Sequence, residues 1–327
     1  MKKRMIAAAC VTAAALVFAG CGSGAGADTQ SDQQAGQESG QAAQESQETE
    51  EQNDSKADDM ADNGQESRDT EEQDGGAADD GISAGEEAAQ SAGKSVSILG
   101  DSISTFRGHN PEGYAVFFPE HGAVKAVEDT WWQQVVNDLE LTLYQNGSSA
   151  GATVVGDSTG MEDPLCAVNE LRTGALMGPA GACPDIILVY LGTNDLLNTI
   201  PMGTNDGTVL VEEGAVTSFS DAYSLMLDKL QAKYPPAEIY CCTLLPVGDY
   251  GTDTPYVDFV NGDELTAADY SGTITQIAEG RGLCVIDLQN CGVTIDNLNE
   301  MTTDGVHPTQ TGMVCIAEAV KKALAGQ

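Results

Sequence analysis

Short apolar runs rich in valine, isoleucine and leucine recur through the second part of the chain. They occupy residues 95–99, 141–144, 185–191, 237–245 and 283–288. Runs this short and this rich in these three residues are typical of strands that are buried on both faces of a parallel sheet. The pattern therefore predicts five parallel strands within residues 95–327.

Helical periodicity fills the intervals between these runs. Apolar residues recur on one face over residues 129–139, 218–234, 266–280 and 309–324. Strands that alternate with helices through right-handed crossovers form a three-layer α/β/α sandwich, here around a five-stranded parallel sheet. In such a sheet, ligands bind beyond the carboxyl ends of the strands.

The first 21 residues have the layout of an export signal. Lys2, Lys3 and Arg4 precede an apolar run that is too short for an ordinary membrane-spanning helix. The run ends in Phe-Ala-Gly-Cys, which resembles a bacterial lipobox and implies a diacylglycerol on Cys21. We expect an exported protein, anchored by this lipid to the outer face of the cytoplasmic membrane or to the cell surface. The alternatives are secretion after cleavage near Ala27 or an uncleaved anchor.

Residues 22–94 differ sharply in composition from residues 95–327. They contain no aromatic residue and no proline, and only Met60 and Ile82 are large aliphatic side chains. Such a segment buries too little apolar surface to offset the entropy of ordering it. We therefore expect a disordered acidic tether that holds a domain of residues 95–327 away from the membrane.

The charge balance excludes two classes of function. The chain carries 51 acidic and 14 basic side chains, for a net charge of −37. Nucleic-acid binding requires a basic surface, which no segment offers. An anionic membrane surface would repel this chain as well. We expect neither nucleic-acid binding nor charge-driven binding to an anionic membrane surface. Separately, we expect the protein to be a monomer.

Seven cysteines lie beyond the tether, at positions 166, 183, 241, 242, 284, 291 and 315. Their spacing is irregular for a disulfide framework or a zinc site, although a bridge between Cys166 and Cys183 stays open. Cys241, Cys242 and Cys284 fall inside apolar runs, where a thiol usually acts as a small core hydrophobe.

Chemically capable residues come directly after the predicted strands. The first strand leads into Gly-Asp-Ser-Ile-Ser (100–104), and the second into the small-residue loop 146–153. The third leads into Gly-Thr-Asn-Asp (192–195), and Asp-Gly-Val-His-Pro (304–308) precedes the last helix. Each segment alone is most simply a turn. Together they bring a serine, an amide, a glycine loop, an aspartate and a histidine to one edge of the sheet, which are the groups that ester hydrolysis requires.

These four segments resemble the sequence blocks of the SGNH (GDSL-type) hydrolase family, whose fold is a flavodoxin-like α/β/α sandwich. The resemblance implies that Ser102 is the nucleophile, His307 its base and Asp304 the group that orients the base. It also implies an oxyanion hole made by the backbone N–H groups of Ser102 and Gly151 and by the amide of Asn194. No metal and no cofactor are required.

The loop 146–153 matches the corresponding block of the family least closely. Gly147 is a second candidate for the oxyanion-hole role that the resemblance gives to Gly151. His307 is favoured as the base because it has an aspartate three residues before it, whereas His109 and His121 lie in the aperiodic segment 107–128. Trp131 and Trp132 could form a sugar-binding platform, but Trp132 at least suits the apolar face of a helix.

The substrate is inferred from location and loop composition. Segments 107–128, 198–217 and 246–262 should surround the pocket, and they contain no broad apolar run. This favours small acyl esters, including O-acetyl groups of glycans, over long-chain lipids. The alternatives are a lipase, lysophospholipase or thioesterase of the same fold, or a non-catalytic carbohydrate-binding lipoprotein. A flavin-binding protein is disfavoured because the turn after the first strand has no further glycine between Asp101 and Gly108.

Overall fold

The computed structural model describes residues 92–160, 165–249 and 255–326. The predicted signal peptide, Cys21 and residues 22–91 of the predicted tether lie outside this part of the chain. Contacts of the domain already begin at Gly93, whose N–H donates to the carbonyl oxygen of Glu140. Within the described ranges, every helix is too short or too polar to cross a membrane.

A five-stranded sheet forms the centre of the domain. Its strands are β1 (Ser95–Gly100), β2 (Thr142–Asn146), β4 (Ile186–Tyr190), β6 (Glu238–Cys242) and β7 (Cys284–Ile286). They lie in the order β2-β1-β4-β6-β7, and every neighbouring pair is parallel. All residues of β1 and β4 are buried, as expected for central strands covered on both faces. The predicted five-stranded parallel sheet is confirmed.

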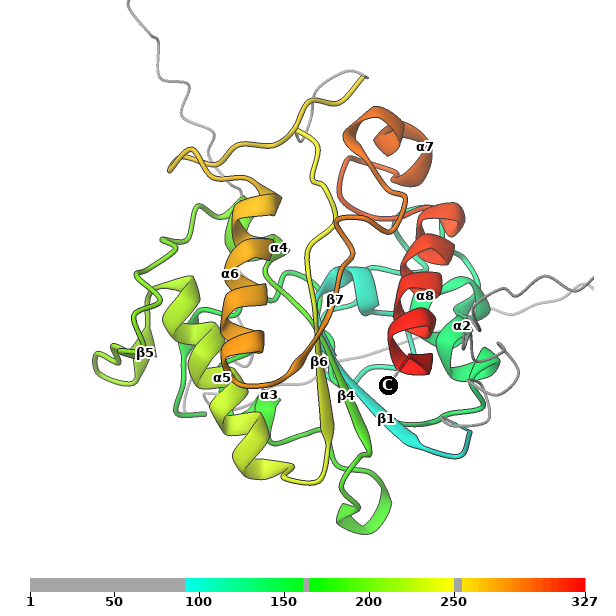
Figure 1. Ribbon diagram of the computed structural model, residues 1–327. Coiled ribbons are helices and arrows are strands. Elements are labelled where there is room, and N and C mark those ends of the chain that lie inside the picture. The colour runs from blue at the N-terminus through cyan, green and yellow to red at the C-terminus, as the bar shows by residue number, and fades with distance from the viewer. Residues whose placement is uncertain (1–91, 161–164, 250–254, 327) are drawn as a thin grey trace, which may run out of the picture. The chain divides into compact units, whose positions relative to one another are not determined.

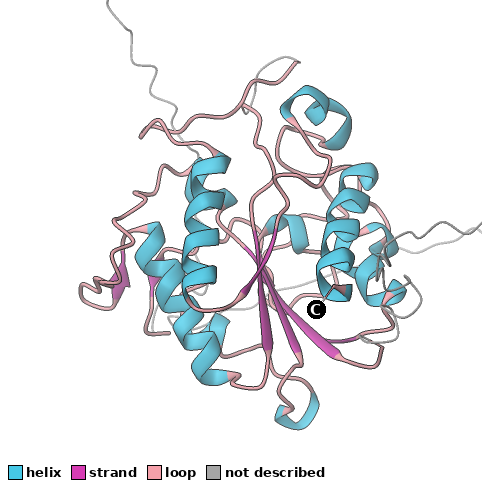
Figure 2. Cartoon of the chain, in the orientation of Figure 1, coloured by secondary structure: helices cyan, strands magenta, loops and turns pink. Residues whose placement is uncertain are grey.

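Helices cover both faces of this sheet. In the view of Figure 1, α5 (Phe219–Lys233) and α6 (Ala267–Gly280) lie on the left of the strands, and α2 (Trp131–Asp138) and α8 (Gln310–Ala325) lie on the right. Figure 2 shows the same three layers by element type. Threonine hydroxyls accept N–H hydrogen bonds at the starts of α2 and α8, and Thr266 forms a capping box at the start of α6. The predicted α/β/α sandwich is confirmed.

Several short elements lie in the connections and were not predicted. Two-residue strands, β3 (Gly156–Asp157) and β5 (Ala215–Val216), pair antiparallel. The short helices are α3 (Glu170–Thr173), α4 (Thr193–Leu197) and α7 (Leu298–Met301). Single 3₁₀ turns lie at Ser102–Ser104, Val127–Asp129, Pro179–Gly181 and Ile295–Asn297.

Two questions stayed open in the sequence, namely a sugar-binding platform of tryptophans and a disulfide bridge, and the structure answers both. Trp131 and Trp132 are both fully buried, so they do not form a sugar-binding platform. The Sγ of Cys166 donates to the carbonyl oxygen of Asp157, and Cys183 is a free thiol, so no bridge joins these two cysteines. Cys284 was expected in the core but is only partly buried, because β7 is an edge strand.

The order of the strands locates a binding edge. The chain moves from β1 to β2 on one side and then returns to place β4 on the other side of β1. The loops that leave β1 and β4 therefore diverge, and this opens a crevice beyond their carboxyl ends. Ser102 lies just after β1 and Asn194 just after β4, so the topology brings both residues to that crevice.

Candidate active site

Three of the predicted side chains form a hydrogen-bonded chain at this crevice. The Oγ of Ser102 lies 2.9 Å from Nε2 of His307. The other ring nitrogen, Nδ1, lies 2.8 Å from Oδ2 of Asp304. Residues 205 positions apart in sequence thus meet in the order hydroxyl, imidazole and carboxylate, the arrangement in which an imidazole can accept the proton of a serine hydroxyl.

Two tight turns hold the hydrogen-bonded side chains of Ser102, His307 and Asp304 in place. The carboxylate of Asp101 accepts the backbone N–H of Ile103 and caps the 3₁₀ turn that begins with Ser102. At the other end, Asp304 accepts the backbone N–H groups of Val306 and His307 through Oδ1, which leaves Oδ2 for the imidazole. Gly305 between them has φ +85°, a conformation that favours glycine.

The environment of Asp304 favours its ionised form. Burial opposes ionisation, but the hydrogen bonds and the positive charge that His307 can carry outweigh it, so the pKa of Asp304 lies below its usual value. A carboxylate ionised at neutral pH keeps the proton of the neutral imidazole on Nδ1. Nε2 is then free to act as a base toward Ser102.

The structure distinguishes between the two candidate glycines. The N–H of Gly147 donates to the carbonyl oxygen of Ile98 at 2.8 Å, so it is occupied within the sheet. Gly151 instead has φ +78° and lines the same cavity as Ser102. A Cβ at this position would meet no atom within 4 Å, so the loop leaves open space at Gly151.

Asn194 and its neighbour tie helix α4 to the loop that carries Gly151. One N–H of the Asn194 amide donates to the carbonyl oxygen of Ala152 at 3.0 Å. The carboxylate of Asp195 accepts the N–H groups of Val154 and Val155. Burial raises the pKa of Asp195 to about 7 despite these hydrogen bonds. The bond to Ala152 uses one of the two N–H donors of the Asn194 amide, and Asn194 lines the same cavity as Ser102.

The cavity beside Ser102 has a volume of about 420 Å³. Polar groups occupy one part of it, around Ser102, Gly151 and Asn194. Apolar side chains form the rest of the wall, namely those of Phe117, Leu197, Phe259 and Val306. Val257 and Val260, close to Phe259 in sequence, are exposed. The loops around the site are therefore more apolar than the sequence had indicated, because residues from separate segments converge on one wall.

Arg172 is a supporting residue that the sequence did not reveal. It lies in the short helix α3 and is 1% exposed. Its guanidinium donates to the carbonyl oxygens of Gly100, Gly147 and Leu165. The first two are the ends of the segments that lead to Ser102 and Gly151. No local pattern around Arg172 signals this, because its hydrogen-bond acceptors include backbone atoms up to 72 residues away.

We expect Arg172→Met to lower the free energy of unfolding by about 2–4 kcal/mol, because it leaves buried carbonyl groups without their charged donor. Urea unfolding of the two proteins measures the difference. Arg107→Met is the matched control, since Arg107 is exposed and pairs with Glu120 at the surface. Arg107→Met should lower the free energy of unfolding by less than about 1 kcal/mol. Equal losses in the two variants would contradict the role given to Arg172.

A second buried carboxylate lies beneath the site. Asp101 is fully buried, and burial raises its pKa to about 6, against the N–H of Ile103 and the charges of His307 and Arg172. Its position one residue before Ser102 makes it a part of the turn, whereas Asp304 is the carboxylate that contacts the imidazole.

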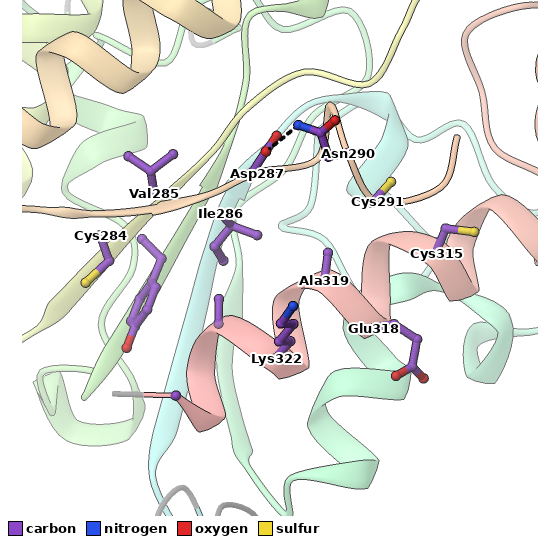
Figure 3. Close-up of a pocket in the computed structure, with 13 residues that line it drawn as sticks. Cys284, Val285, Ile286, Asp287, Asn290, Cys291, Cys315, Glu318, Ala319 and Lys322 are labelled. Carbon is purple, nitrogen blue, oxygen red and sulfur yellow. Dashed lines mark hydrogen bonds between the residues drawn. The ribbon is translucent and has the colours of Figure 1, made fainter. Parts of the chain in front are cut away.

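A larger cavity, of about 630 Å³, lies elsewhere, between β7 and α8 (Figure 3). Its wall includes Cys284, Cys291 and Cys315, and a hydrogen bond joins Asp287 to Asn290. Burial raises the pKa of each of these three thiols, so they are protonated and weakly nucleophilic at neutral pH. The thiols of this cavity are thus not activated nucleophiles, and the crevice at Ser102 is the candidate active site.

A family model and several solved structures resemble this chain. Residues 94–247 match the family model of the GDSL-like lipase/acylhydrolases, a stretch that contains Ser102, Gly151 and Asn194. No curated protein matches the chain in sequence.

Solved structures share the fold. A protein from Bacteroides uniformis named as a GDSL-like lipase is 27% identical, with a TM-score of 0.52 over 72% of this chain and 97% of its own. One from Bacteroides ovatus with the same designation is 24% identical, with a TM-score of 0.52 over 72% of this chain and 100% of its own. A Lactobacillus plantarum protein is 22% identical, with a TM-score of 0.53 over 72% of this chain and 98% of its own. The chain thus contains a GDSL-like lipase/acylhydrolase domain, matched over residues 94–247, and is a carboxylic ester hydrolase.

Proposed function

We propose that this hydrolase is a serine esterase that cleaves short acyl esters through an acyl-enzyme on Ser102. The observation that carries the proposal is the hydrogen-bonded chain from Ser102 through His307 to Asp304 at the edge of a cavity. His307 accepts the proton of Ser102 as Oγ attacks the ester carbonyl, and it then donates that proton to the leaving alcohol. No metal or organic cofactor takes part in these steps.

The oxyanion is stabilised by three donors. These are the backbone N–H groups of Ser102 and Gly151 and the second N–H of the Asn194 amide. The position of Gly151 and Asn194 in the wall of one cavity with Ser102 supports this assignment.

Short acyl groups are favoured by the size of the cavity. A volume of about 420 Å³ is at the lower end of the range of about 300–1,000 Å³ for small-molecule sites. The apolar side chains of Leu197 and Phe259 suit the acyl chain, while the exposed part of the substrate stays in solvent. We propose O-acyl groups of glycans as the natural class of substrate, on the protein's expected location at the cell surface through lipidated Cys21. We propose that the protein acts there as a monomer.

The direct test is covalent labelling of the full chain by a fluorophosphonate, followed by mass spectrometry of the labelled peptide. The proposal requires modification of Ser102 together with hydrolysis of p-nitrophenyl acetate. Binding of glycans without either reaction would instead support a non-catalytic carbohydrate-binding protein.

The apolar wall also leads to a prediction about acyl length. Each additional buried methylene should raise kcat/KM about four-fold from p-nitrophenyl acetate to butyrate, since burial of one CH₂ contributes about 0.8 kcal/mol. Leu197→Ala should reduce turnover of butyrate more than turnover of acetate, because the longer chain contacts more of the wall. Val314→Ala, on the exposed surface of α8, is the control. Preference for palmitate over all shorter esters would contradict the short-acyl assignment.

A further inference from the structure

The imidazole of His307 is covered on one face by an aromatic ring. The ring of Phe117 is stacked on it, with centroids 3.6 Å apart and planes inclined by only 9°. The ring of the adjacent Phe118 and the imidazole are arranged edge to face, with centroids 6.4 Å apart and planes inclined by 82°. The imidazole is therefore held in its plane by hydrogen bonds at both nitrogens and by a ring against one face.

Phe117 is itself fixed to the turn that carries the nucleophile. Its backbone N–H donates to Oγ1 of Thr105 at 2.9 Å, and this hydroxyl donates to the carbonyl oxygen of Ser102, also at 2.9 Å. The neighbouring Phe118 is fully buried, which anchors the segment in the core. The ring, the imidazole and Ser102 thus form one connected unit.

The hydrogen bonds of the imidazole change during the proposed reaction. When Ser102 is acylated, its Oγ has no proton and the bond to Nε2 is lost. His307 must then accept a proton from a water molecule as the water oxygen attacks the acyl carbon. The bond between the acyl carbon and Oγ breaks, and the proton passes from Nε2 to Oγ. Until that water binds at Nε2, the bond between Asp304 and Nδ1 is the one of the two described hydrogen bonds of the ring that remains.

We infer that Phe117 is a positioning residue that keeps the imidazole aligned while Ser102 is acylated. A single hydrogen bond at Nδ1 acts as a pivot, and the stacked ring of Phe117 restrains rotation about it. The inference rests on the proposed serine esterase mechanism. We therefore expect Phe117 to matter most for deacylation, when His307 has lost its hydrogen bond to Ser102 and is aligned less firmly.

The inference is tested with Phe117→Leu and p-nitrophenyl acetate in a stopped-flow experiment. We expect the deacylation rate to fall about ten-fold, the upper end of what an aromatic pair contributes. The acyl-enzyme should accumulate, so that a burst of p-nitrophenol becomes larger and kcat and KM fall together. The rate of labelling of Ser102 by a fluorophosphonate should change less than about three-fold, because labelling requires no deacylation. Phe117→Tyr keeps a flat ring and should restore deacylation.

Phe106→Leu is the matched control, since it removes a ring that packs on His109 in the same segment. It should leave the ratio of burst to steady-state rate unchanged. Equal loss of labelling and of deacylation in Phe117→Leu would reduce Phe117 to a general structural role and overturn the inference, as would no change in either. Failure of the mechanism itself gives a different result, namely turnover that persists in Ser102→Ala.

Discussion

Ser102→Ala is expected to abolish ester hydrolysis while leaving the domain folded. Loss of the nucleophile in a serine hydrolase lowers kcat by a factor on the order of 10⁶, because no acyl-enzyme can form. Ser102 is buried, and its Oγ contacts Nε2 of His307, so removal of the hydroxyl takes away one hydrogen bond and little volume. The measurement is kcat for p-nitrophenyl acetate, with the melting temperature recorded on the same sample.

Ser104→Ala provides the control in the same turn. Its hydroxyl accepts the indole N–H of Trp131, and the residue is fully buried. This variant should lose some stability but keep its activity within a few-fold. If Ser102→Ala retained more than about one per cent of wild-type activity, the nucleophile would have to be another group, because the residual rate of a triad variant is several orders of magnitude lower.

Asn194→Ala should lower kcat by about 10²–10³, the usual cost of one oxyanion donor. KM should change little, because the oxyanion exists only in the transition state and the tetrahedral intermediate. The comparison is made over a full substrate curve so that the two constants are separated.

Asn198→Ala is the matched control. Asn198 is exposed one turn further along the chain, and its amide donates to the backbone carbonyl of Asn194. We expect its kcat to remain within about three-fold of wild type, as for most surface changes. Asn194→Ala with unchanged kcat and a raised KM would show that the amide binds the ground state rather than the oxyanion.

The sheet and the chemical residues were predictable from the sequence because both leave local signals. Buried parallel strands appear as short apolar runs, and β4 is such a run with all five residues buried. Ser102, Asn194 and His307 lie next to glycine-containing turns at strand ends or before a helix. Parallel strands bring their carboxyl ends to one edge, so linear order was enough to predict that these residues meet.

Contacts between distant backbone and side-chain atoms were not predictable in this way. The choice between Gly147 and Gly151 depends on a hydrogen bond from Gly147 to Ile98 in the neighbouring strand. Arg172 acts on carbonyl oxygens far away in sequence, from a helix of four residues. Phe117 lies in a segment without periodicity, and its partner His307 is 190 residues later. Each role arises from tertiary packing, which leaves no repeat or spacing in the chain.

The attachment of α4 to the loop after β2 affects how the enzyme can diversify. Asn194 and Asp195 bind that loop across the end of β1, so hydrogen bonds connect two of the three proposed oxyanion donors, Gly151 and Asn194, through one loop. Phe259 comes from a separate segment, secured by the hydrogen bond from its own N–H to the carbonyl oxygen of Val247. Substitutions of the Phe259 side chain can alter which acyl group fits while the bonds among Ser102, His307 and Asp304 stay in place. Substrate range can therefore drift in evolution, or be redesigned, independently of catalytic power.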